Sequence, residues 1–194
     1  MARESVTPSI DHLVSTLGAA RRRSRQEAAH QIARVAHEDV TSLRPFVGEL
    51  IDSLYRPEAQ TRWEIFDALG ELALIDADAV EGGYEGAEAS LFDEGSATVR
   101  LAAFRFLCRL GASAPRHSDL VWPLLDEAVQ CYHGDPEYHD MLIALLEFAR
   151  GDLSGAARDA LVGRVSFDAK NGQSFIKGYS AQIITVAQDG GCHV

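Results

Sequence analysis

The chain has 194 residues, of which 46% are hydrophobic, so it is long and apolar enough to fold around a sizeable core rather than remain disordered. Its formal net charge is −11, from 29 acidic and 18 basic side chains, and a protein of this charge repels nucleic acid and anionic membranes on average. The sequence has no run of about 18 apolar residues, which excludes a membrane-spanning helix from the predicted elements.

Two helix pairs with a common offset are predicted in the first part of the chain. The first pair is expected over about 8–19 and 24–37, and the second over about 42–55 and 60–75. Ten positions of the first pair recur 37 residues later as chemically matched residues: Pro8, Ile10, Leu13, Val14, Leu17, Arg25, Glu27, Ile32, Val35 and Ala36. A period of this length is typical of helix-pair solenoids, whose single repeats cannot bury their apolar face alone.

The same register continues, with less similarity, through three more second helices, which are expected over about 97–112, 136–150 and 174–188. The position of Arg25 recurs at intervals of 37, 38, 38 and 38 residues, as Arg62, Arg100, Tyr138 and Ile176. A small residue follows the apolar stripe of each second helix, and a small side chain lets two helices approach closely. These small residues are Ala36, Ala73, Gly111, Ala149 and Ala187.

The first helices of the later units are less alike, and they are expected over about 77–92, 117–132 and 154–165. The helix over 77–92 contains Gly82, Gly83 and Gly86, each of which weakens an isolated helix by roughly 1 kcal/mol relative to alanine. Pro123 lies well inside the next first helix, where it predicts a kink or a delayed start.

These elements predict an all-α protein, a right-handed α-α superhelix of about five antiparallel helix pairs. A single domain is expected over residues 1–188, with units at about 7–38, 42–76, 77–113, 116–150 and 153–188. A cap with a β-hairpin that turns at residues 170–172 is the alternative for residues 165–188, but Ile183 and Val186 keep the repeat phase and favour a helix. Residues 189–194 are expected to form a loose tail.

The units resemble HEAT repeats, the antiparallel helix pairs of many α-solenoid proteins. A proline early in the first helix is typical of this family, and Pro8 and Pro45 match it. A turn acid followed by a Val-Arg pair is also typical, and Asp93 with Val99 and Arg100 matches it. The resemblance implies an α-solenoid of the kind that acts as a scaffold for protein partners, although related short bacterial arrays include pigment lyases and DNA glycosylases.

The face of the second helices opposite the core stripe is the candidate binding surface, because these helices line the concave side of such arrays. Helical geometry places Trp63, Asp67 and Glu71 on this face of the second unit. Trp63 is the best anchor candidate, since tryptophan is enriched at interface hot spots, and packing against Leu101 or Gln26 is its structural alternative. The candidate partner-binding residues are Trp63, Asp67, Glu71, Arg105, Arg109, His30, Arg34 and His139.

One position of this face alternates in charge from unit to unit, as Arg34, Glu71, Arg109 and Glu147. Two explanations are compatible with the alternation: a ladder of ion pairs between units, each contributing about 0–1 kcal/mol, or a groove that recognises a partner of mixed polarity. The segment 76–94 adds seven carboxylates and no basic residue, and it either attracts a basic partner or forms a solubilising outer face.

Arg21, Arg22, Arg23 and Arg25 form a dense basic cluster in the first inter-helix turn. The cluster suits a phosphate group or an acidic peptide, because guanidinium groups form paired hydrogen bonds with phosphate and carboxylate oxygens. It lacks the length of the continuous basic channel that duplex binding needs, so nucleic acid is not an expected partner.

Residue types that often form metal or catalytic sites are scattered along the chain. Cys131 with His133, and Cys192 with His193, lack the paired CxxC spacing that makes a zinc site recognisable. No serine nucleophile motif and no phosphate-binding loop accompany the seven histidines. We therefore expect no metal, no cofactor and no catalytic residue.

The sequence predicts a noncatalytic scaffold or adaptor that presents a concave helix surface to a protein partner, with an inhibitor or immunity factor for a basic effector as its narrower form. The alternative is an enzyme or enzyme accessory that holds a small ligand in the groove around Trp63, Asp67 and Arg105, as pigment-lyase-like arrays do. The three cysteines are widely spaced and the start of the chain lacks the apolar core of a secretory signal, so a reduced, cytoplasmic location is expected.

Overall fold

The computed structural model describes residues 8–190, and this part of the chain contains helices and turns but no strand. The elements in chain order are α1 (Ile10–Leu17), α2 (Arg22–Asp39), η1 (Val40–Phe46), α3 (Val47–Ser53), α4 (Ala59–Ala73), α5 (Ala77–Val80), η2 (Glu81–Gly83), α6 (Tyr84–Leu91), α7 (Ala97–Gly111), α8 (Pro115–Cys131), α9 (Tyr138–Ala149), α10 (Gly155–Asn171) and α11 (Ser174–Asp189). The all-α fold class that the repeat period predicts is confirmed.

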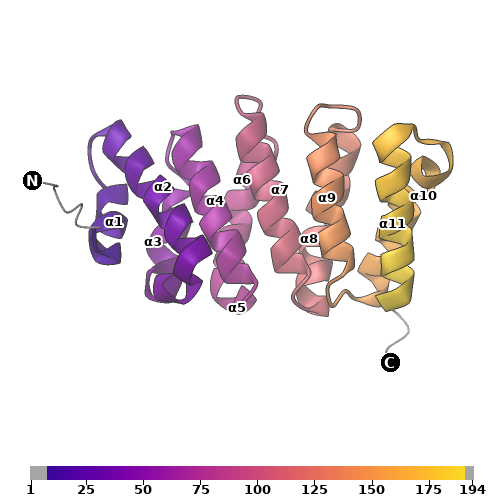
Figure 1. Ribbon diagram of the computed structural model, residues 1–194, viewed down its shortest axis with the longest axis horizontal. Helices are drawn as coiled ribbons and strands as arrows, with labels where there is room; N and C mark the ends of the chain where they lie inside the picture. The colour runs from indigo at the N-terminus through magenta and orange to yellow at the C-terminus, as the bar shows by residue number, and fades with distance from the viewer. Residues whose placement is uncertain (1–7, 191–194) are drawn as a thin grey trace, which may run out of the picture.

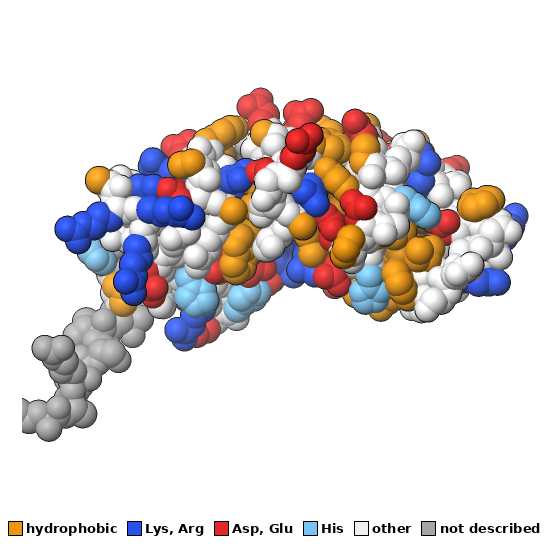
Figure 2. Space-filling view, turned by 90° about the horizontal axis from the view of Figure 1, so that it is seen from above, with side chains coloured by type: hydrophobic (Ala, Val, Ile, Leu, Met, Phe, Trp, Pro, Cys, Tyr) orange, Lys and Arg blue, Asp and Glu red, His pale blue; other side chains and the backbone are white. Residues whose placement is uncertain are grey.

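The helices form two layers (Figure 1). The second helices of the units, α2, α4, α7, α9 and α11, lie side by side in chain order, and α1, α3, α6, α8 and α10 lie behind them. Each second helix packs against the next one, so the two ends of the array are the two ends of the chain. Seen from above, the molecule is arched and is hollowed on the side of the second helices (Figure 2). Within residues 8–190 no helix is long and apolar enough to cross a membrane.

The second helices are the best-predicted elements, since all five begin and end within two residues of their expected positions. One apolar position is fully buried in every unit, at Ile32, Leu69, Leu107, Leu145 and Ile183. The fifth unit keeps this phase because α10 and α11 are both helices, so the hairpin alternative for the end of the chain is wrong.

Gly111 shows why a small residue follows the apolar stripe. A methyl group added at this position would lie 2.4 Å from Cγ2 of Val121 and 2.7 Å from the ring of Phe148. The backbone of α7 therefore lies against side chains of both α8 and α9, and the predicted close approach of helices is confirmed here.

The third first helix differs from the single helix expected over 77–92, because it is divided into α5, η2 and α6. Its glycines allow close packing at the break and just after it. A methyl group added at Gly83 would lie 3.0 Å from the ring of Phe106, and one added at Gly86 would lie 2.8 Å from Cδ1 of Leu54. Low helix propensity, together with close contact with α7 and with the preceding unit, explains the break.

Three further predictions about the elements need correction. α8 begins at Pro115 and continues through the exposed Pro123, so of the two predicted effects of this proline the delayed start is wrong. α10 continues to Asn171 rather than ending near residue 165, and Asp189 ends α11 instead of starting the tail. The rest of the expected tail, residues 191–194, lies outside the described residues.

Candidate functional site

A series of ion pairs joins the turns of neighbouring units, and we call it the turn ladder. It consists of Arg25 with Glu58, Arg62 with Asp93, and Arg100 with Glu137. Arg62 Nη2 donates to Asp93 Oδ2 at 2.6 Å, and Arg100 Nε donates to Glu137 Oε1 at 3.1 Å. Each arginine thus binds an acid in the turn just before the second helix of the next unit and holds consecutive second helices in register.

The arginines lower the pKa values of the ladder carboxylates. Hydrogen bonding to Arg25 lowers the pKa of Glu58, and hydrogen bonding to Arg62 lowers the pKa of Asp93. At Glu137 burial is the largest single influence and raises the pKa, but the hydrogen bond from Arg100, a backbone hydrogen bond and the charge of Arg100 together lower it below its ordinary value. All three side chains therefore favour the ionised form.

Tyr138 replaces the arginine in the fourth unit and keeps the function of the ladder. Its hydroxyl donates to Oδ2 of Asp168 at 3.3 Å, and Nε2 of His133 lies 3.0 Å from the same oxygen. Burial, together with the charge of Asp168, raises the pKa of Tyr138 well above its ordinary value. Sequence reasoning missed the acceptors Glu58, Glu137 and Asp168, although an acid just ahead of Arg62 and of Tyr138 was a usable signal.

The hollow side of the array contains a groove of about 460 Å³ that spans three consecutive units, and we call it the concave groove. Its wall is formed by side chains of α4, α7 and α9. They are Trp63, Phe66, Asp67, Gly70, Thr98, Leu101, Ala102, Arg105, Phe106, Arg109, Ile143, Ala144 and Glu147.

Four of the eight predicted binding residues, Trp63, Asp67, Arg105 and Arg109, line the concave groove together. A fifth, Glu71, lies beside them, with Oε1 accepting from Nη1 of Arg109 at 2.8 Å. Trp63 is half-buried and packs against the core while it also lines the groove, so its anchoring and packing interpretations are compatible.

The alternating charges of this face form an ion pair at one step only, between Glu71 and Arg109. Arg34 instead pairs with Glu38 on its own helix at 3.3 Å, and Nδ1 of His37 lies 3.5 Å from Oε1 of Glu71. Glu147 is exposed and forms no ion pair with any residue between 8 and 190. A continuous ladder is therefore absent from the concave face of this part of the chain.

The other three predicted binding residues lie away from the concave groove. Nδ1 of His30 is 3.0 Å from Oε1 of Glu64, and Arg34 lines a separate cavity between α1 and α2. The ring of His139 makes edge-on contacts with the rings of Phe175 and Tyr179 on α11, at centroid distances of 4.8 and 5.3 Å. These contacts join neighbouring helices.

His37, Asp67 and Glu71 are the group of metal-ligand type found within residues 8–190, with ligand atoms within 4.8 Å of one another. His37 Nε2 lies 2.7 Å from Oδ2 of Asp67, so the imidazole already has a hydrogen-bond partner. The guanidinium of Arg109 on Glu71 repels a cation, and we therefore assign no metal to this group.

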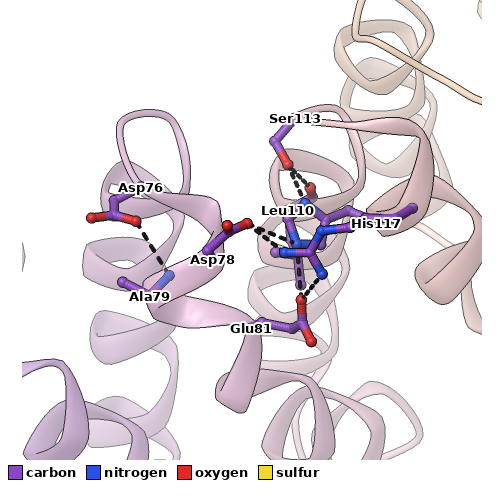
Figure 3. A network of polar contacts seen from close by, with 8 residues as sticks. Asp76, Asp78, Ala79, Glu81, Leu110, Ser113 and His117 are labelled. Atoms are coloured by element: carbon purple, nitrogen blue, oxygen red, sulfur yellow. Dashed lines mark hydrogen bonds and ion pairs between the residues drawn. The ribbon is translucent and has the colours of Figure 1, made fainter.

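The acidic segment 76–94 is partly neutralised by the neighbouring unit, as Figure 3 shows. Asp78 and Glu81 point toward His117, and Arg116 contacts both carboxylates at 2.5 Å. Asp76 caps the start of α5 by accepting from the backbone N–H of Ala79. Among the described residues the exposed carboxylates of this segment without an ion pair are Glu85, Glu88 and Glu94.

Ser113, His117 and Glu81 lie in the order of a serine hydrolase relay but are not arranged for that chemistry (Figure 3). Ser113 Oγ is 2.6 Å from Nδ1 of His117, and Nε2 of His117 is 3.0 Å from Oε2 of Glu81. The hydroxyl of Ser113 donates its proton to the carbonyl of Leu110 at 2.7 Å, and His117 is 1% exposed. The network joins two units instead of activating a nucleophile.

Comparison with known proteins supports the architecture only at the level of structure. No family model and no curated protein matches the chain. A designed armadillo repeat protein, YIII(Dq.V1)4CPAF in complex with peptide (KR)4, is similar to it with a TM-score of 0.76 and 14% identity, over 92% of this chain and 81% of that chain. Computationally designed armadillo repeat proteins for modular peptide recognition are similar with a TM-score of 0.73 and 12% identity, over 95% and 89%.

The chain is a helical-repeat solenoid. An engineered protein from a structural genomics consortium also resembles it, with a TM-score of 0.72 and 18% identity; the similarity covers 95% of this chain and 52% of that chain, so this solenoid spans about half its length. The similarities do not separate HEAT repeats from armadillo repeats, and at these identities they establish the fold alone.

Proposed function

We propose that this solenoid is a noncatalytic protein-binding module whose concave groove holds an extended segment of a partner protein. The observation that carries the proposal is a half-buried tryptophan, Trp63, in a groove that runs across three units and ends at the unpaired carboxylate of Glu147. A groove of this kind offers one large apolar anchor and charged groups at successive positions along a chain.

Trp63 is suited to anchor a partner because its surroundings are already ordered. It packs against the core on one side, so its ring is held in place before a partner binds. Leu101 and Ile143, from the next two units, also line the groove and extend the apolar floor. Binding would cover these side chains without a large loss of side-chain entropy.

The charge of the groove favours a basic segment. Two carboxylates, Asp67 and Glu147, line the groove. Two more lie beside it: Glu71, which pairs with Arg109, and Asp140, which is 3.4 Å from Arg105. The arginines that line the groove are Arg105 and Arg109. Lysine or arginine side chains would therefore find an excess of carboxylates. The similar designed protein in complex with peptide (KR)4 supports this choice of partner chemistry.

The narrower form of the proposal is an inhibitor or immunity factor that covers a basic effector. The net charge of −11 supports this form, because opposite net charges accelerate the encounter of two proteins. Enzymatic use of the groove is less well supported, because Asp67 and Arg105 are each paired with a neighbour, at 2.7 and 3.4 Å.

Tryptophan fluorescence with an alternating Lys-Arg octapeptide tests the proposal. The chain has two tryptophans, and Trp122 stacks on Phe148 away from the groove, so Trp122→Phe leaves Trp63 as the sole reporter. We expect the peptide to change the emission of this variant with a saturable curve. Trp63→Ala should weaken binding of the labelled peptide, measured by anisotropy, at least about tenfold.

One further groove variant and one control variant complete the test. Glu71→Arg should weaken peptide binding more than it lowers the midpoint of urea unfolding, because it reverses the charge beside Arg109. Trp122→Phe should bind the labelled peptide as wild type does, since a phenyl ring keeps the stacking on Phe148. Equal affinity of wild type, Trp63→Ala and Glu71→Arg would show that the groove is not the binding surface.

A further inference from the structure

The arginines of this solenoid divide into paired and unpaired sets. Nine described arginines form ion pairs with carboxylates: Arg25, Arg34, Arg44, Arg62, Arg100, Arg105, Arg109, Arg116 and Arg164. Arg158 donates to the backbone carbonyls of Leu153 and Ala187. Five described arginines have neither a hydrogen-bond partner nor an ion-pair partner for their side chains among residues 8–190: Arg21, Arg22, Arg23, Arg56 and Arg150.

Four of these five unpaired arginines belong to the adjoining turns of the first two units, and we call them the arginine edge: Arg21, Arg22, Arg23 and Arg56. Arg22 lies close enough to Glu58, two residues after Arg56, for its charge to act on that carboxylate. Glu58 is itself paired with Arg25 and so does not neutralise the edge. Figure 2 shows basic side chains gathered at the N-terminal end of the array, seen from above.

The position of the arginine edge is unfavourable for the isolated protein. Arg21 precedes the first residue of α2, and Arg22 and Arg23 are in its first turn, which has no acidic residue and no side-chain cap. Cations repel the positive end of the helix dipole, and three consecutive arginines repel one another. A protein whose other arginines are mostly paired keeps these charges together at a place where folding alone disfavours them.

We propose that the arginine edge binds an acidic segment, rich in aspartate and glutamate, of a protein partner. The guanidinium groups of Arg21, Arg22 and Arg23 are exposed and can each form two parallel hydrogen bonds with a carboxylate. The edge is short, so it matches a few successive carboxylates. A long polyanion such as duplex nucleic acid would extend past it and meet the repulsion of a protein with a net charge of −11.

Fluorescence anisotropy of a labelled, alternating Asp-Glu octapeptide, at several salt concentrations, tests this inference on the full chain. The variant Arg21→Gln/Arg22→Gln/Arg23→Gln should bind at least about tenfold more weakly than wild type, with a smaller salt dependence. The matched control is Arg150→Gln, since Arg150 is also exposed and unpaired but lies at the end of α9. It should bind the peptide as wild type does.

Folding and the partner class are tested on the same proteins. The triple variant should keep the helical circular dichroism of wild type and should not unfold at a lower temperature, because it removes repulsion at the start of α2. Equal peptide affinity of wild type and the triple variant would overturn the inference, as would tighter binding of a labelled 20-base-pair DNA duplex than of the peptide. The triple variant should bind the Lys-Arg octapeptide normally, so this inference and the proposed function fail independently.

Discussion

The turn ladder and the concave groove are built from the same residue types at similar spacing, but they differ in exposure. In the ladder the side chains of Arg100 and Glu137 are 13% and 9% exposed, whereas those of Arg105 and Asp140 at the groove are 52% and 43% exposed. A pair withdrawn from water must remain paired, because separating it leaves a charge without solvent. A pair in water can exchange its partner for a ligand at little cost.

The difference assigns separate tasks to the two regions. The ladder repeats from unit to unit, with a tyrosine substituting for an arginine in the fourth, and its loss should affect folding. The groove has ion pairs at some positions and the unpaired carboxylate of Glu147 at another, and substitutions of its residues should affect binding more than folding. Four measurements test this division.

The largest effect is expected from Arg100→Ala in the turn ladder. Arg100 pairs with Glu137, donates to the carbonyl of Asp93 at 2.8 Å and lies over the ring of Tyr132 at 4.9 Å. Its removal should lower the free energy of unfolding by about 2–3 kcal/mol, somewhat below the cost of breaking a fully buried pair, because both groups retain some exposure. Urea unfolding followed by circular dichroism measures the change, and a loss below about 1 kcal/mol would contradict a structural ladder.

Two glycines inside second helices allow the same substitution in the core and on the groove. Gly111→Ala would place a methyl group 2.4 Å from Val121 in the core and should cost about 1–3 kcal/mol through overpacking. At Gly70 the added methyl group would meet the flexible end of the Arg109 side chain at 3.0 Å. Arg109 can move, and alanine stabilises a helix by about 1 kcal/mol relative to glycine. The free energy of unfolding of Gly70→Ala should therefore lie within about 1 kcal/mol of the wild-type value. Similar losses for both variants would remove the distinction.

Acid should weaken the turn ladder. The pKa values of Glu58, Asp93 and Glu137 are lower in the folded protein than in the unfolded chain. The stability that these carboxylates contribute is therefore fully present above their pKa values in the unfolded chain, and it is lost as the pH falls through their pKa values in the folded protein. The free energy of unfolding should therefore decline from about pH 5 toward about pH 3. Glu137→Gln should be less stable than wild type at neutral pH, and its free energy of unfolding should fall less steeply as the pH is lowered. If the two proteins lost stability in parallel, Glu137 would not contribute to the acid sensitivity of the turn ladder.

The smallest effect on folding is expected from Arg105→Ala at the groove. Its pair with Asp140, at 3.4 Å, is about half exposed, so the variant should lose less than about 1 kcal/mol of unfolding free energy. Comparison with Arg100→Ala in the same urea titration is the measurement, because both variants remove one arginine from α7. A loss equal to that of Arg100→Ala would show that exposure does not separate the two regions.

Much of the candidate groove was predictable because helix geometry alone places its residues. Trp63, Asp67, Arg105 and Arg109 line one groove as their positions on the second helices predict. Arg34 corresponds to Arg109 in the repeat, but it lies in the cavity between α1 and α2. His139 corresponds to Trp63, but its ring packs against the rings of Phe175 and Tyr179 on α11. Periodicity places a residue on a face but does not determine which neighbours the adjoining units provide.

The number of helix pairs, the phase of their second helices and the small residue at Gly111 could all be predicted from the apolar spacing along each helix. Which charges meet could not be predicted, because it depends on how the units pack. Arg25 lies 33 residues before its partner Glu58, Arg62 lies 31 before Asp93 and Arg100 lies 37 before Glu137. These offsets vary because turn lengths differ, and the distance between two side chains in neighbouring units depends on how the helices shift against each other when the core packs.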